Sequence, residues 1–186
     1  MASLATPHQF TREAYRKMVE SGVLAEDDRV ELVRGAIVDK MPAGPSHGAC
    51  VKRLTRFFTA LVASRAIVSV QDPLALGEDS EPEPDLALLA PSDDFYAQSH
   101  PGAKDVWLVV EVADSSVAYD LRTKVPLYAE HGIPEVWIVD LQRKELRVFR
   151  GPAGGRYLID GTFRTGDVVP LDVLPGESFP VDACGF

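Results

Sequence analysis

The sequence predicts a mixed domain of the α/β or α+β class, with one central sheet covered by helices. The chain has 186 residues, the usual length of one domain, so residues 1–186 are expected to form a single domain. Two near-continuous apolar runs, at 85–90 and 106–112, are typical of strands buried on both faces of a sheet. Residues 51–62 instead carry apolar side chains at helical spacing. Helices and buried strands therefore share one short chain.

The composition is that of a globular protein. Hydrophobic residues make up 46% of the chain and charged residues 25%, which excludes wholesale disorder. No apolar run approaches the ~20 residues of a membrane span, and the N-terminus has no apolar stretch typical of a signal peptide. Cys50 and Cys184 have no spacing suited to zinc or redox chemistry, so we expect free thiols. These observations predict a soluble, cytoplasmic protein.

The net charge is −9, which argues against a nucleic-acid footprint spread over the whole surface. The charge is uneven, however. Residues 1–68 hold ten basic and seven acidic side chains, whereas residues 69–186 hold nine basic and 21 acidic ones. A local basic face in the N-terminal part is therefore expected.

The N-terminal third contains signals for two helices and a hairpin. A short helix is expected from Thr11, as N-cap, to Gly22. Alternating stretches at 29–34 and 36–41 surround Gly35 and indicate a hairpin. Ser46 precedes a longer helix, whose exposed positions supply most of the basic excess: Lys52, Arg53, Arg56 and Arg65.

The remaining elements follow from shorter patterns. Short strands are expected at 66–70 and 73–76, and again after a hairpin formed by 135–140 and 145–150. A helix is expected to start at Asp120, as N-cap, and to end at Gly132. Pro126 falls too late for its first turn, which predicts a shortened or kinked start.

Two carboxylates stand out by position. Glu111 lies inside the run VWLVVEV, where an isolated charge costs several kcal/mol unless it is paired or bound to metal. Asp85 follows Pro84 and opens the other apolar run. If these runs are neighbouring strands, both carboxylates reach one point, and two carboxylates with waters suit Mg²⁺. The alternatives are a turn or capping role for Asp85 and a buried ion pair for Glu111.

Three further residues are candidates. Lys124 follows Glu111 by thirteen residues and could orient a water or stabilise charge on a phosphate, although a lysine at a helix start is usually solvated. Glu31 alternates with apolar neighbours and could equally face solvent. His47 could donate to a phosphate or cap the second helix.

Taken together, the blocks VELVRG, PEPDLALL, residues 106–140 and ELRVFR closely resemble the Uma family of bacterial putative restriction endonucleases. That family belongs to the PD-(D/E)XK nuclease superfamily, and the resemblance covers about residues 8–180. It implies a restriction-endonuclease-like fold, in which a central mixed sheet is flanked by helices.

The resemblance also implies a site. Asp85 and Glu111 match the two carboxylates of the superfamily, and Glu31 and His47 fall where the family often has an acid and a histidine. One departure is that Ala113 stands where the usual motif has its lysine, so Lys124 becomes the candidate. It must then converge on Glu111 from the following helix.

The implied activity is Mg²⁺-dependent endonucleolytic cleavage of nucleic acid, of DNA in particular, with Mn²⁺ as a substitute. Asp85, Glu111 and the Val112 carbonyl would hold the metal. Lys124 would position or help deprotonate the attacking water, and Glu31 would support the site from outside the metal ligands or hold a second metal ion. The expected substrate contacts are His47, Lys52 and Arg122, and a homodimer is expected because double-strand cutters of the superfamily commonly dimerise.

Two alternatives stay open: a non-catalytic binding or scaffold protein that keeps the nuclease fold, and a metal-dependent hydrolase of a small phosphorylated substrate. A basic rim around the Asp85–Glu111 cleft would favour the nuclease, and an acidic rim would favour the scaffold. If Lys124 lies at the surface, its truncation should abolish cleavage and leave folding almost unchanged.

Overall fold

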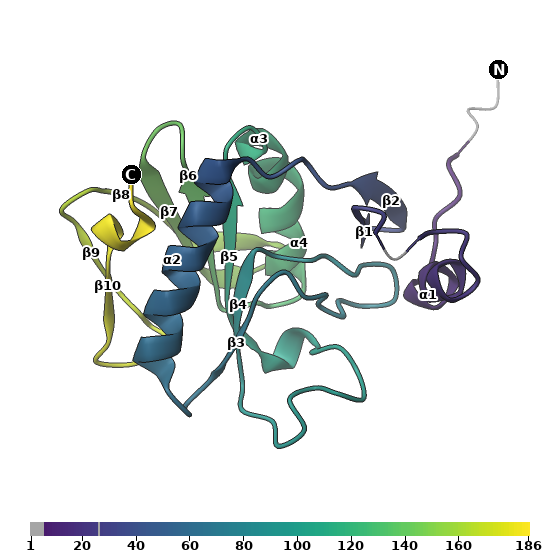
Figure 1. Cartoon of the computed structure of the whole chain (residues 1–186), viewed down its shortest axis with the longest axis horizontal. Coiled ribbons are helices and arrows are strands. Elements are labelled where there is room, and N and C mark those ends of the chain that lie inside the picture. The colour runs from purple at the N-terminus through teal and green to yellow at the C-terminus, as the bar shows by residue number, and fades with distance from the viewer. Residues whose placement is uncertain (1–5, 26) are drawn as a thin grey trace.

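A six-stranded mixed sheet forms the centre of the protein, seen in a computed structural model that describes residues 6–25 and 27–186 (Figure 1). Residues 1–5, part of the segment expected to lack a signal peptide, lie outside the described residues, as does residue 26. The spatial order follows the chain order: β3 (Ile67–Ser69), β4 (Leu86–Leu89), β5 (Val106–Ala113), β6 (Glu135–Asp140), β7 (Glu145–Ala153) and β8 (Arg156–Arg164).

The two apolar runs are neighbouring strands of this sheet. β4 pairs with β5 in antiparallel fashion, and β5 pairs with β6 in parallel, the one parallel pair of the six-stranded sheet. Every residue of β4 and β6 is buried, as is every residue of β5 except Trp107, which is half-buried. The predicted burial on both faces is therefore confirmed.

Helices cover both faces of the sheet. One face packs against α2 (Pro45–Val62) and the C-terminal elements β9 (Val168–Pro170), β10 (Ser178–Pro180) and η3 (Val181–Cys184). The other face packs against α4 (Val125–Glu130). Figure 1 shows α2 and α4 on either side of β5, so the expected sheet between helices is confirmed.

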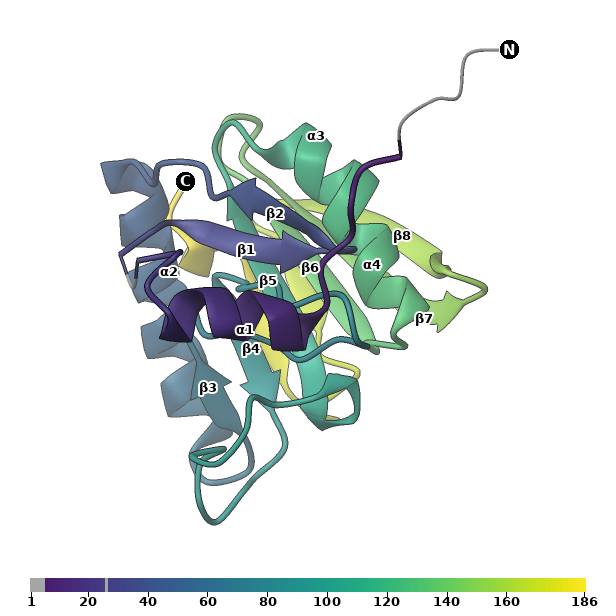
Figure 2. The same cartoon turned by 90° about the vertical axis from the view of Figure 1, so that its right-hand side faces the viewer.

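The N-terminal elements lie outside this layered core (Figure 2). They are α1 (Arg12–Glu20), capped by the Thr11 hydroxyl, and the antiparallel pair β1 (Val30–Val33) and β2 (Ala36–Asp39). An isolated bridge between Leu32 and Glu81 joins the hairpin to the segment before β4. The hairpin thus sets Glu31 against the core.

Three local predictions were wrong. α2 begins at Pro45 with Gly44 as N-cap, so Ser46 lies within the helix. Residues 73–76 form no strand of the sheet, and only Ala75 and Leu76 among them form isolated bridges. The helix after β5 begins at α3 (Val117–Tyr119) with Ser116 as N-cap, and Asp120 is an internal residue that accepts a hydrogen bond from the Ser116 hydroxyl.

The helix containing Pro126 is irregular, as predicted, but in an unexpected way. Between α3 and α4, residues Asp120–Lys124 form a π-turn (η2), in which the Val125 N–H donates to the Asp120 carbonyl, five residues back. Pro126 is the second residue of α4. Proline has no N–H, and inside a continuous regular helix its ring would clash with the carbonyl of the preceding turn. The widened turn accommodates it.

A short 3₁₀ turn, η1 (Ala103–Asp105), precedes β5. Over residues 6–25 and 27–186, no helix combines the length and the hydropathy required to cross a membrane.

Candidate active site

Asp85 and Glu111 lie on the same face of the sheet. Leu86 is the partner of Val110 in the β4–β5 ladder, so one further step sets Asp85 opposite Glu111. Directly opposed residues of an antiparallel pair point to the same side. Both side chains line one cleft at this end of the two strands. The expectation that the two runs are neighbouring strands is confirmed, and their register sets Asp85 and Glu111 on one face of the sheet.

The Asp85 side chain holds the backbone of β5 beyond the last paired residues of β4 and β5. The Val112 N–H donates to Asp85 Oδ2 at 2.9 Å. The N–H and C=O of one strand residue leave the same edge, so the Val112 carbonyl faces the Asp85 side. The residue opposite Val112 in the extended register is Pro84, which has no N–H to donate. The Val112 carbonyl therefore lies at the cleft without a ladder donor from Pro84.

Lys124 joins two acidic side chains from different elements. Its Nζ lies 3.1 Å from Glu111 Oε1 and 3.1 Å from Glu31 Oε1. The Tyr128 hydroxyl donates to the same Glu111 oxygen at 2.6 Å, and the Glu83 N–H donates to Glu31 Oε2. Lys124 is 6% exposed and Glu111 4%, so this network is buried. Lys124 does converge on Glu111, but the expectation of a surface lysine is wrong.

Burial governs the protonation of this network. Burial raises the pKa of Glu111 to about 8, and Lys124 offsets this only in part. Burial also acts to lower the pKa of Lys124, but Glu111 and Glu31 outweigh it and raise that pKa above its usual value. Lys124 is thus a charged ammonium at neutral pH, and Glu111 keeps a proton more readily than a solvated glutamate.

Asp85 has its own set of partners. His47 Nε2 lies 2.9 Å from Asp85 Oδ2, and Gln71 Nε2 donates to Oδ1 at 3.1 Å. Burial acts to raise the pKa of Asp85, but His47 and the Val112 N–H prevail and lower it. The hydrogen bond to Asp85 in turn raises the pKa of His47. Within residues 6–25 and 27–186, His47 Nδ1 is buried and has no hydrogen-bond partner.

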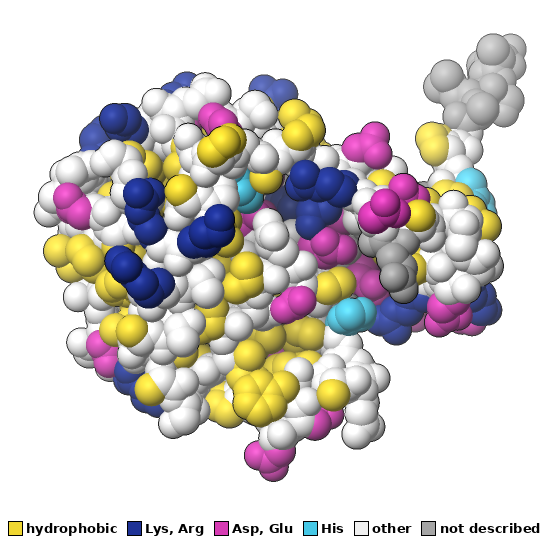
Figure 3. Space-filling model, in the orientation of Figure 1, with side chains coloured by type: hydrophobic (Ala, Val, Ile, Leu, Met, Phe, Trp, Pro, Cys, Tyr) yellow, Lys and Arg dark blue, Asp and Glu magenta, His cyan; other side chains and the backbone are white. Residues whose placement is uncertain are grey.

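These residues line a cleft of about 260 Å³ between the β1–β2 hairpin and the six-stranded sheet. Glu31, His47, Asp85, Glu111, Val112 and Lys124 all contribute to it. Figure 3 shows acidic, basic and histidine side chains together in this hollow. Within the described residues, seven carboxylates and three Lys or Arg side chains line the cleft, so its lining is acidic.

Two predicted substrate contacts lie outside the cleft. Lys52 is exposed on α2, where Lys and Arg side chains gather on the surface (Figure 3). Arg122 lines a neighbouring shallow groove together with Arg143. The predicted basic rim is therefore absent from the lining of the cleft, and the basic face lies on α2 beside it.

Sequence reasoning missed three residues of the site: Asp120, Tyr128 and Gln71. Asp120 is 4% exposed and lines the cleft, and burial raises its pKa. Its spacing of four residues from Lys124, one helical turn, was an available signal. Tyr128 continues the same spacing, whereas nothing local in the sequence points to Gln71.

The donor set suits Mg²⁺ better than a metal that needs a full cage of side chains. In the part of the chain that the structure describes, no group of three or more His, Cys, Asp or Glu side chains is arranged to hold a metal ion. Mg²⁺ needs only one or two carboxylates, because it keeps several waters. Asp85, Glu111 and the Val112 carbonyl offer that oxygen set.

Comparison with known proteins finds both a matching family and similar solved structures. A model of the Uma2 family, described as "Putative restriction endonuclease", matches residues 12–182. A crystal structure described as a putative nuclease belonging to DUF820, from Anabaena variabilis, is similar with a TM-score of 0.72 and 16% identity, over 94% of this chain and 97% of that one. At that identity the likeness shows the fold. No curated protein matches the chain.

Proposed function

Because the chain belongs to the Uma2 family of putative restriction endonucleases, we propose that it is a metal-dependent endonuclease that hydrolyses phosphodiester bonds, those of DNA in particular. The observation that carries this proposal is the pair formed by Asp85 and Glu111 on one sheet face, with the Lys124 ammonium 3.1 Å from Glu111. Carboxylates and a cation at one point are what phosphodiester hydrolysis requires.

Asp85, Glu111 and the Val112 carbonyl would hold Mg²⁺, or Mn²⁺ in its place. When bound, the ion supplies positive charge that stabilises the pentavalent phosphate and the leaving oxygen. His47 and the Val112 N–H fix the orientation of Asp85, since both contact Oδ2. Tyr128 fixes Glu111 in the same way.

Lys124 acts by orienting the reacting groups. Its raised pKa keeps the ammonium protonated, so it donates to the attacking water or to a phosphate oxygen and does not remove a proton. Glu31 holds the other side of the ammonium. Of the two roles expected for Lys124, positioning the water is the one that its charge state supports.

Substrate contacts are proposed on two surfaces next to the cleft. Lys52 lies with Arg53 and Arg56 on the exposed face of α2, whose N-terminal turn carries His47. Arg122 faces the shallow groove on the other side. Both surfaces are positioned to contact the phosphate backbone that extends beyond the scissile bond.

The acidic lining of the cleft favours the second candidate, a non-catalytic binding protein with the nuclease fold. Phosphates approach an acidic surface at an electrostatic cost. The two candidates differ in one respect: a nuclease must first neutralise the cleft with divalent cations. Nucleic-acid binding that requires a divalent cation is therefore expected of the nuclease.

The test is cleavage of plasmid and linear DNA with Mg²⁺, with Mn²⁺ or with EDTA. We compare wild type with Glu111→Gln, which keeps the shape of the side chain, and with the exposed control Glu20→Gln. Wild type and control should cut with either metal, and Glu111→Gln should not. Cutting by Glu111→Gln at the wild-type rate would refute the proposal.

A second readout does not depend on turnover. Mg²⁺ or Mn²⁺ should raise the melting temperature of wild type, because the ion binds the folded state alone. The double variant Asp85→Asn/Glu111→Gln should lose this shift. Equal shifts in both proteins would exclude a shared metal site.

A homodimer is part of the proposal, and its support is the free edge of the sheet. β8 is the last strand of the six and spans nine residues. Leu158 is 72% exposed on it and Ile159 56% exposed. A long edge strand with exposed apolar side chains is suited to pairing with a second copy.

A further inference from the structure

The cleft is small, and three of its charged groups are almost fully buried. Its volume of about 260 Å³ is below the ~300–1,000 Å³ of pockets that enclose a small ligand. Glu31, Glu111 and Lys124 are each at least 94% buried. A scissile phosphate must therefore enter the cleft to reach them. A DNA duplex, whose major groove alone is ~12 Å wide, is too wide to enter the cleft together with that phosphate.

The charge of the lining points the same way. Asp39, Glu83 and Asp114 are among its carboxylates, and Lys40, one of its three cations, is already paired with Glu83 at 2.6 Å. A duplex brings one phosphate per ~1.7 Å of axis, whereas one strand brings one per ~3.4 Å. The acidic lining thus opposes a duplex more strongly than a single strand.

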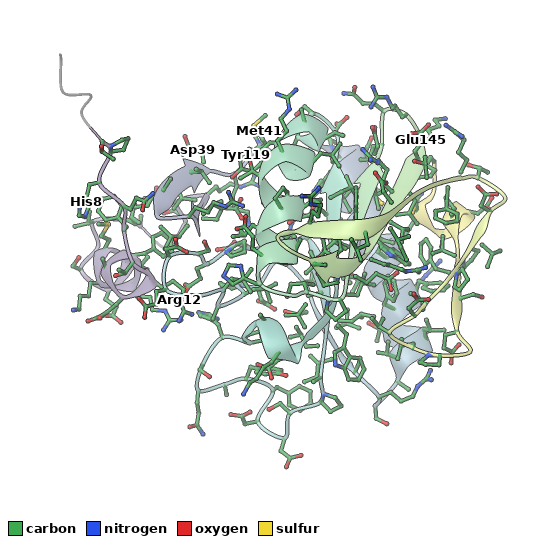
Figure 4. All side chains as sticks on the ribbon, turned by 180° about the vertical axis from the view of Figure 1, so that it is seen from behind. His8, Arg12, Asp39, Met41, Tyr119 and Glu145 are labelled. Carbon is green, nitrogen blue, oxygen red and sulfur yellow. The ribbon has the colours of Figure 1, made fainter. Side chains whose placement is uncertain are left out.

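One wall of the cleft is apolar. It consists of Val38, the segment 41–43 and the ring of Tyr119. Met41 is 57% exposed, it lines the cleft together with Tyr119, and Figure 4 labels both residues in the same region of the view from behind. The Tyr119 hydroxyl is buried and has no hydrogen-bond partner among the residues that the structure describes. Apolar and aromatic walls bind unpaired bases, whose faces a duplex hides.

We propose that the substrate of this cleft is an unpaired nucleic-acid strand, such as a single-stranded tail or flap, with a base against Tyr119 and Met41. This inference rests on the proposed nuclease function. It restricts the proposed substrate class from nucleic acid in general to unpaired strands.

The first test compares three forms of one labelled DNA sequence: the single strand, the blunt duplex, and the duplex with an unpaired tail. With Mn²⁺ present, wild type should cut the single strand and the tail at least about tenfold faster than the blunt duplex. Equal or faster cutting inside the blunt duplex would overturn the inference.

If the protein is not a nuclease, no form of the DNA is cut, or Glu111→Gln cuts as fast as wild type. In that case the preference for an unpaired strand is tested by measuring DNA binding instead of cleavage. Fluorescence anisotropy of wild type with Ca²⁺ should show the single strand bound at least about tenfold more tightly than the blunt duplex. Equal binding, tighter duplex binding, or no binding of either form would overturn the inference.

The second test removes the apolar wall. Tyr119→Ser should weaken binding of the single strand by about tenfold, the typical loss for one stacked base, and Met41→Ser should cause a smaller loss. Binding of the blunt duplex should not change. Phe95→Ser is the matched control, because Phe95 is 74% exposed and lies outside the lining of the cleft. Unchanged single-strand binding in both wall variants would contradict the proposed contact.

Discussion

Lys124 neutralises two buried carboxylates, so its removal should affect folding as well as chemistry. Lys124→Ala leaves Glu31 and Glu111 without their cation, and breaking a buried pair in this way costs about 3–5 kcal/mol. Urea unfolding should show a loss of that size. The control Lys144→Ala, at an exposed position, should stay within ~0.5 kcal/mol of wild type. A Lys124 variant as stable as the control would contradict the buried network.

Glu111 should make the stability of the fold depend on pH. Its pKa of about 8 in the folded state lies above the 4.5 of a solvated glutamate, so the folded state binds the extra proton. The stabilisation is complete below pH 4.5 and is lost as the pH rises towards 8. Relative to Glu111→Gln, wild type should lose up to ~1.4 kcal/mol per pH unit in this window. Parallel stability curves from pH 5 to 9 would refute the raised pKa.

Single residues were predictable from the sequence where their chemistry conflicts with their surroundings. Glu111 is a charge inside an apolar strand, and the resemblance pointed to Lys124 once Ala113 was seen in place of the usual lysine. Ala113 is fully buried, so a small apolar side chain occupies that strand position. Gln71 could not be predicted, because its role depends on a contact across 14 residues that no local pattern marks.

At the scale of elements, the strands of the central sheet were predictable because alternation and apolar runs are local signals. The start of α1 was predicted correctly, whereas those of α2 and α3 were not. Ser116 and Asp120 are both good N-caps, and Pro126 suggested a late start. The π-turn resolves this conflict by adding a residue to the turn, so that the helix begins at Val117. Such turns are frequent at functional sites, and this one carries both Asp120 and Lys124.

Glu81 is one of the buried acids that tie the N-terminal elements to the core. Glu81 is 4% exposed and accepts a hydrogen bond from Arg16 at 3.0 Å, with an Arg12 nitrogen 4.0 Å away. Glu81→Gln should therefore increase amide exchange in α1 and β1–β2, and leave β5 and β6 protected. Hydrogen exchange with mass spectrometry measures this, with Glu20→Gln as control. Uniform protection in the Glu81 variant would show that other contacts anchor α1.

At the scale of the whole molecule, the edge strand β8 is suited to pairing with itself. An antiparallel register centred on Leu158 sets Arg156 of one copy opposite Asp160 of the other, twice across the two-fold axis. Sedimentation velocity over a concentration series should show a dimer for wild type and a monomer for Leu158→Lys. Phe95→Lys, which changes an equally exposed apolar side chain elsewhere, should remain a dimer. A monomeric wild type, or a dimeric Leu158→Lys, would refute this interface.

The site draws its groups from a hairpin, two strands and a helix, and this affects how distant relatives can be found. Glu111 and Lys124 meet at 3.1 Å although 13 positions separate them, and Glu31 joins from 80 positions upstream of Glu111. A search pattern with a fixed gap between acid and lysine passes over such a chain. A three-dimensional template of carboxylate and ammonium positions, which ignores the order of the residues in the sequence, would find this chain. It would also find proteins in which the lysine lies on a different helix or strand.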